Sequence, residues 1–181
     1  MGWLGGIFAM RGERVSIGLW NALCREMGEG ETVRIGGRLF GRCGLIFCDV
    51  GGGSPFVQPL CRRVGDHSVA VAVEGEVTPE EVLSVYRGSG IDAVGRLSGS
   101  FTLSVWDDRM GELLLARGGD GGLPLYCAES EGMLIFSSRL QALLPLLPSR
   151  VLCRGIRTVP SGFCGLGSRL GFSLPVPIPP P

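Results

Sequence analysis

The stretch 94–117, VGRLSGSFTLSVWDDRMGELLLAR, decides the fold class of this chain. In residues 100–106, large apolar side chains alternate with Thr and Ser, and this period of two is typical of a β-strand. The turn 107–111 contains two Asp residues, which favour turns because their side chains bond their own backbone, and residues 112–117 form the returning strand. Residues 124–137 predict a further hairpin. Successive antiparallel hairpins with helices outside them predict an α+β fold.

Other segments supply further strands and two helices. Apolar runs predict strands at residues 4–10, 39–50 and 68–73. The first helix is expected to begin at a Ser16 cap and end at Gly28, with four apolar residues at helical spacing, Ile17, Trp20, Leu23 and Met27. The second begins with the capping box Thr78-Pro79-Glu80-Glu81 and ends near residues 88–90. Residues 173–181 are rich in proline, which cannot donate to a sheet, and predict a frayed tail.

The composition excludes several kinds of chemistry. The formal net charge of the 181 residues is zero, so no nucleic-acid partner is expected. All 17 basic residues are arginine, which excludes a P-loop lysine and any Schiff-base mechanism. The single histidine, His67, leaves little room for a His-rich metal site and is expected at the surface or at a strand edge. No apolar run is long enough to cross a membrane, so no membrane partner is expected.

The seven cysteines favour a reducing compartment. They include no C-x-x-C pair, and their number is odd, so they predict small buried thiols rather than disulfides or a zinc site. We therefore expect a cytoplasmic protein with no metal and no cofactor.

Six short motifs, in order, resemble one known family. They are Gly5-Gly6-Ile7-Phe8, Glu74-Gly75-Glu76, the stretch 94–117, Gly121-Gly-Leu-Pro-Leu-Tyr126, Leu134–Leu144 and Val159-Pro160-Ser161-Gly162. Together they resemble the class II glutamine amidotransferase domain of asparagine synthetase-like proteins. The resemblance implies an N-terminal-nucleophile hydrolase fold, in which two stacked antiparallel sheets lie between helical layers as an αββα sandwich. It implies one domain over residues 1–172, followed by the proline-rich tail 173–181.

The family's catalytic groups are replaced in this sequence. In that family a cysteine exposed as residue 1 attacks glutamine, and the resemblance places Gly5 at that position. The oxyanion-hole asparagine aligns with Glu74, the carboxylate-binding arginine with Gly44, and the ammonium-binding acid with Pro79. Arg42 could replace the arginine if the register were shifted, since it lies two positions from Gly44. The resemblance therefore implies no catalytic residue and a remnant substrate pocket made of Arg42, Gly44, Glu74, Gly75 and Glu76.

Three functions remain open at this point. The first is a non-catalytic domain that serves as a structural or regulatory subunit for a separate ATP-pyrophosphatase-type, asparagine synthetase-like enzyme. The second is an active glutaminase with a nonstandard nucleophile, for which Cys24 is the candidate to test. The third is a small-amine sensor in which Glu74 and Glu76 face a cation. A homodimer is a further option for the assembly.

Overall fold

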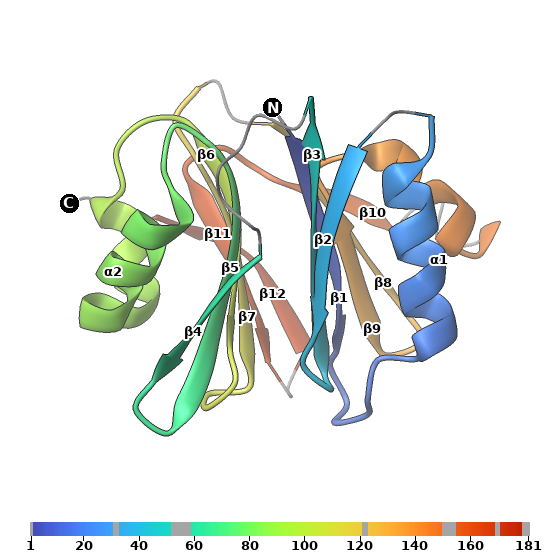
Figure 1. The fold of residues 1–181 in the computed structure, drawn as a ribbon, viewed down its shortest axis with the longest axis horizontal. Helices are drawn as coiled ribbons and strands as arrows, with labels where there is room; N and C mark the ends of the chain where they lie inside the picture. Colours follow the sequence, from blue (N-terminus) through green and yellow to red (C-terminus); the bar gives the residue numbers. More distant parts are fainter. Residues whose placement is uncertain are drawn as a thin grey trace.

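Two antiparallel sheets stacked face to face form the core of the computed structural model, and helices cover their outer faces (Figure 1). The structure describes residues 2–30, 33–51, 59–120, 123–149, 155–168 and 171–178. Each sheet has six strands in this described part of the chain. The expected αββα sandwich is confirmed.

Sheet A contains the N-terminal strand at its centre. Its strand order is β10 (Ile156–Val159), β8 (Leu125–Ser130), β9 (Met133–Ser137), β1 (Gly2–Ala9), β3 (Cys43–Val50) and β2 (Val33–Leu39). Helix α1 (Ile17–Gly28) and the short 3-10 turns η2 (Leu140–Ala142) and η3 (Leu144–Leu146) cover its outer face. Strand β1 is buried along its whole length, because it has a sheet neighbour on each side and a layer above each face.

Sheet B contains the hairpin that dominates the sequence. Its strand order is β12 (Gly171–Pro177), β11 (Phe163–Ser168), β7 (Glu112–Gly118), β6 (Phe101–Asp107), β5 (His67–Gly75) and β4 (Leu60–Val64). Helix α2 (Pro79–Ser89) and the 3-10 segment η1 (Gly90–Arg96) lie on its outer face (Figure 1). The capping box at Thr78 is present, with Thr78 accepting from the Glu81 amide while the Glu81 side chain accepts from Thr78.

The inner faces of the two sheets share one apolar core. Phe8 of β1 meets Trp106 of β6 across this space, with ring centroids 5.7 Å apart. The polar side chains of the hairpin, Thr102 and Ser104, also point inward and are fully buried. Both faces of this strand are therefore buried. The polar residues and Trp106 face sheet A and the other large apolar residues face α2, so the alternation of apolar and polar side chains does not mark a solvent-exposed face.

Three expectations need correction. Ile17 is 60% exposed, so the buried face of α1 rests on Leu23 and Met27. The run 39–50 is not one strand, since β2 ends at Leu39 and the chain turns through Gly41, whose φ of +75° suits glycine, before β3 begins. The proline-rich segment is not a separate tail from residue 173, because β12 extends to Pro177 and pairs with β11. Proline is tolerated there since β12 is an edge strand.

Candidate functional site

The first strand begins beside an acidic residue of the other sheet. Glu74, near the end of β5, shares the inward face of that strand with Ala70 and Ala72, and its carboxylate accepts a hydrogen bond from the Gly2 amide of β1. Burial raises the pKa of Glu74 to about 7, and the Gly2 amide opposes that rise. Its Oε2 atom is buried and has no hydrogen-bond partner in the described part of the structure. A partly desolvated, incompletely bonded carboxylate therefore lies at the start of β1.

The two residues after Glu74 shape the chain rather than a pocket. Gly75 has φ of +125°, and a Cβ there would lie 2.2 Å from the Ser100 carbonyl oxygen, so only glycine fits. The Glu76 carboxylate accepts a hydrogen bond of 2.6 Å from the Ser100 amide. Glu76 thus ties the end of β5 to the loop before β6.

Two glycines of β1, Gly2 and Gly5, occupy positions where an added side chain would be crowded. Gly5 pairs with Ile46 and Ser137, and a Cβ added there would lie 3.0 Å from the Phe136 carbonyl oxygen and 3.1 Å from the Met27 sulfur. Its missing side chain would thus point toward the α1 layer. Gly2 faces the space between the sheets, where a Cβ would lie 2.3 Å from the Cys48 carbonyl oxygen. The residue beside Glu74 is therefore Gly2, three residues before the aligned Gly5.

Arg42 and Gly44 lie far from Glu74. Arg42 precedes β3, and its guanidinium donates to the carbonyl oxygens of Ala9 at 3.0 Å and Met10 at 3.3 Å, at the opposite end of β1 from Gly2. Gly44 faces helix α1, and a Cβ there would lie 2.3 Å from the Trp20 ring.

The residues expected to form the remnant substrate pocket lie in separate parts of the structure. Glu74, Gly75 and Glu76 lie at one end of the sandwich and Arg42 at the other, so these residues and Gly44 do not line a single pocket. Pro79 is buried in the first turn of α2, where it starts the helix.

None of the thiols with a shifted pKa is activated. Burial raises the pKa of Cys48 to about 12 and that of Cys127 to about 11. Burial also raises the pKa of Cys24, Cys43 and Cys164 above the usual value for a thiol. A nucleophilic cysteine needs the opposite shift, since the thiolate is the reactive form.

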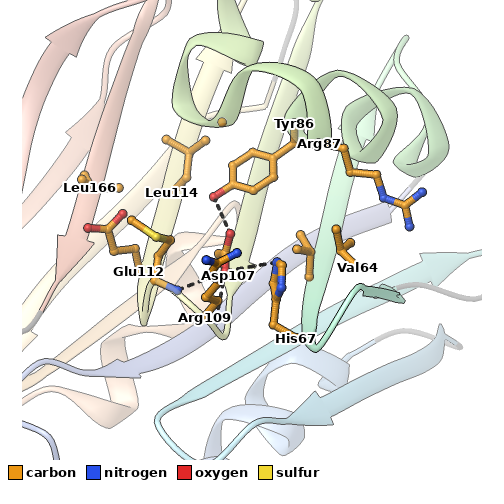
Figure 2. A pocket seen from close by; sticks show the side chains of 12 residues that line it. Val64, His67, Tyr86, Arg87, Asp107, Arg109, Glu112, Leu114 and Leu166 are labelled. Atoms are coloured by element: carbon orange, nitrogen blue, oxygen red, sulfur yellow. Dashed lines mark hydrogen bonds and ion pairs between the residues drawn. The ribbon is translucent and has the colours of Figure 1, made fainter.

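A cavity of about 530 Å³ lies at the other end of sheet B, on its outer face under α2 (Figure 2). Buried Asp107, at the end of β6, accepts hydrogen bonds from the Tyr86 hydroxyl at 3.3 Å and from the amides of Arg109 at 3.0 Å and Met110 at 3.2 Å. His67 Nε2 lies 4.0 Å from the same carboxylate. His67 does begin a strand, although its side chain is largely buried against this cluster.

Sequence reasoning found part of this cluster. It identified Asp107 as a turn residue, which the bonds to the Arg109 and Met110 amides confirm. It missed the bond from Tyr86, which is 21 residues distant and carries no local signal.

Neither a metal centre nor a membrane span emerges from the described residues. No group of three or more His, Cys, Asp or Glu side chains among them is placed to hold a metal ion. No helix in this part of the chain has the length and apolar character needed to cross a membrane.

Comparison with known proteins identifies the family. A family model described as a glutamine amidotransferase domain matches residues 58–156, more than half of the chain. The chain belongs to this family of glutamine amidotransferase domains, and its fold is of the N-terminal-nucleophile hydrolase type. No curated protein matches it significantly.

Two solved structures share the fold. The chain is similar to the glutamine phosphoribosylpyrophosphate amidotransferase from B. subtilis complexed with ADP and GMP, at 14% identity and a TM-score of 0.69 over 98% of this chain. It is similar at 15% identity, with the same TM-score and coverage, to a structure titled the allosteric regulatory enzyme of purine biosynthesis. In both cases it spans 49% of the solved chain, about half its length.

Proposed function

We propose that this chain is a glutamine amidotransferase-type domain that does not hydrolyse glutamine and acts as a structural or regulatory partner of an ATP-dependent, asparagine synthetase-like enzyme. The observation that carries the proposal is the packing of β1. A Cβ at Gly2, beside Glu74, would collide with the Cys48 carbonyl oxygen at 2.3 Å, and a Cβ at Gly5, the aligned nucleophile position, would be tightly packed against the Phe136 carbonyl oxygen and the Met27 side chain. Chemistry that needs a thiol on a residue with a free amine has no place in this strand.

The second support is the character of Glu74. An oxyanion hole donates hydrogen bonds to the negative charge that forms on the substrate oxygen. A carboxylate cannot donate when ionised, and it repels that charge. With its pKa near 7, Glu74 is partly ionised at neutral pH, so it opposes the transition state that an asparagine would stabilise.

The alternative of a nonstandard nucleophile has weak physical support. Cys24 lies on α1, on the outer face of sheet A, whereas Glu74 faces the space between the sheets. Burial raises the pKa of Cys24, so its reactive thiolate is scarce at neutral pH.

The partner role comes from the resemblance of the ordered motifs to asparagine synthetase-like proteins. The chain covers about half the length of the solved relatives. In our proposal the amide-forming chemistry belongs to another domain or protein, and this chain binds and shapes it. The cytoplasmic location stays part of the proposal, since an ATP-dependent synthetase works where ATP is held.

Ammonia release tests the loss of glutaminase activity. Purified protein is incubated with glutamine, and ammonia is measured beside a Cys24→Ala variant. We expect neither protein to exceed the rate in buffer. Steady turnover that the Cys24→Ala change abolishes would establish an active glutaminase instead.

Co-purification from the native host tests the partner. The chain is purified at low salt, and bound proteins are identified by mass spectrometry. We expect an ATP-dependent synthetase in stoichiometric amount, whose amide-forming rate falls when the chain is removed. A monomer that binds no synthetase across the accessible concentration range would contradict the partner role.

A small-amine sensor is a second candidate, supported by one observation. The Glu74 Oε2 atom is buried without a partner among the described residues, and an ammonium group would satisfy it. Glu76 is engaged at its Oε2 atom by the Ser100 amide, so the argument rests on Glu74. A thermal-shift screen of amines against the wild type and Glu74→Gln decides the point, since an equal response of both proteins would remove Glu74 from the argument.

A further inference from the structure

A second hollow lies at the start of β1, on the side of sheet A that α1 and η2 cover. This cavity of about 370 Å³ is lined by Trp3, Pro124, Tyr126, Ser138, Arg139 and Gln141, together with two leucines. No acidic side chain is among these lining residues, and Arg139 is the one that carries a charge at neutral pH. The hollow therefore has a single positive charge beside aromatic and aliphatic walls.

The Arg139 guanidinium is held in place by an aromatic ring. Its central carbon lies 4.8 Å from the centroid of the Trp3 ring, a stacking distance for a cation on an indole. Trp3 is itself fixed, because its indole nitrogen donates to the Met27 carbonyl oxygen at 2.8 Å. The Arg139 amide also donates to the Ser137 hydroxyl at 2.9 Å. The planar group is thus positioned before any ligand arrives, which reduces the entropy lost on binding.

The hydrogen-bonding capacity of this guanidinium is not used up within the described part of the chain. Its Nη1 atom is buried and donates to nothing there, and no carboxylate of these residues lies within ion-pair distance of it. A buried donor without a partner is costly, and a cationic one more so. An anion that enters the cavity would compensate the positive charge of the guanidinium, whereas the Nη1 atom itself is closed to solvent in the structure.

We propose that this cavity binds a small monocarboxylate with an apolar or aromatic body. Carboxylates match the forked edge of a guanidinium, and one cation balances one negative charge, whereas a phosphate dianion would leave charge uncompensated. The walls formed by Pro124, Tyr126 and the leucines suit an apolar body, and the volume lies in the range of small-ligand pockets. The site is separate from Glu74 and does not depend on the loss of glutaminase activity.

Paired probes test the charge and the body of the ligand. Binding of 3-phenylpropionate and of its neutral analogue 3-phenylpropionamide to the full chain is followed by ligand-observed NMR and by the indole N–H signals of the tryptophans. We expect the carboxylate to bind about tenfold or more tightly than the amide, because a charge-assisted hydrogen bond is lost in the amide. Equal binding of the two probes, or no binding of the carboxylate at about 10 mM, would overturn the proposal.

Substitutions assign the binding to Arg139. Arg139→Gln is expected to weaken 3-phenylpropionate binding to the level of the amide, while the matched control Arg157→Gln, which changes an ion-paired surface arginine of the same sheet, leaves binding unchanged. If Arg139→Gln does not fold, as judged by circular dichroism, Arg139→Lys decides, since it keeps the charge and loses the fork. Wild-type affinity in a folded Arg139→Gln variant would place the ligand elsewhere, and wild-type affinity in Arg139→Lys would contradict recognition by the forked guanidinium. None of these measurements involves glutamine hydrolysis, so their failure leaves the proposed function untouched.

Discussion

Two carboxylates of sheet B lie at opposite ends of one strand pair and show opposite degrees of hydrogen bonding. Glu74, near the end of β5, faces the space between the sheets and receives the Gly2 amide, while its Oε2 atom has no partner among the described residues. Asp107, at the end of β6, lies on the outer side under α2 and accepts three hydrogen bonds (Figure 2). Five residues of extended strand, about 17 Å, separate the two ends.

The difference separates a carboxylate whose hydrogen bonds stabilise the fold from one whose hydrogen bonding is incomplete. Asp107 bonds the β6–β7 turn and the Tyr86 side chain of α2, so its removal should lower the free energy of unfolding. Glu74 is desolvated without full compensation, as its raised pKa records, so its charge weakens the fold. Glu74 of β5 lowers stability and lies beside the first residue of β1. It is therefore the residue at which to look for an interaction with a ligand or another protein.

The largest effect is expected at Asp107. Asp107→Ala removes the acceptor of three bonds and leaves two backbone amides and a tyrosine hydroxyl to find water, so we expect a loss of about 3 kcal/mol in the free energy of unfolding. Urea denaturation at neutral pH measures it. The neighbouring Asp108→Ala, on an exposed turn residue, is the matched control and should change stability by less than about 0.5 kcal/mol. Equal effects of the two variants would show that the bonds to Asp107 contribute little.

The second effect is at Glu74 and has the opposite sign. A carboxyl whose pKa is raised on folding is most favourable while protonated, so its contribution to stability is present below pH 4.5 and is lost as the pH rises to about 7. Glu74→Gln keeps an acceptor for the Gly2 amide and removes the charge. At pH 8 the variant is therefore expected to be more stable than the wild type by about 1–2 kcal/mol, after discounting for partial exposure.

Denaturation curves at several pH values check this prediction. The difference between Glu74→Gln and the wild type should vanish near pH 4 and grow up to about pH 8. A difference that is constant with pH would mean that Glu74 is not the titrating group.

Features that depend on residues close together in the chain could be predicted from the sequence. The hairpin of β6 and β7 and the capping box at Thr78 were predicted correctly, because both depend on residues within a few positions of one another. The stacking of two sheets came from the family resemblance of ordered motifs. The hairpin and the capping box depend on local sequence patterns, and the stacking of the sheets was inferred from the order of the motifs along the chain.

The arrangement of the candidate site depends on register and on which way each strand faces. Aligned motifs placed Gly5 at the nucleophile position, while the pairing of β1 turns that residue toward Met27 and brings Gly2 to Glu74. Arg42 lies two residues from Gly44, yet it bends toward the far end of β1, where it donates to Ala9. A shift of one residue reverses the face of a strand, and nothing in a single sequence fixes that shift.

The smallest effect on stability is expected from the single hydrogen bond between the Tyr86 hydroxyl and Asp107. Burial raises the pKa of Tyr86, and the adjacent Asp107 carboxylate raises it further, so the hydroxyl stays a donor at all physiological pH values. Tyr86→Phe removes that donor and keeps the ring against sheet B, which should cost about 1 kcal/mol. In an Asp107→Ala background the same change should cost almost nothing, because the acceptor is already gone, and a double-mutant cycle by urea denaturation measures the coupling. If Tyr86→Phe costs as much in that background as in the wild type, the hydroxyl acts through a group other than Asp107, and its bond to Asp107 does not link α2 to the β6–β7 turn.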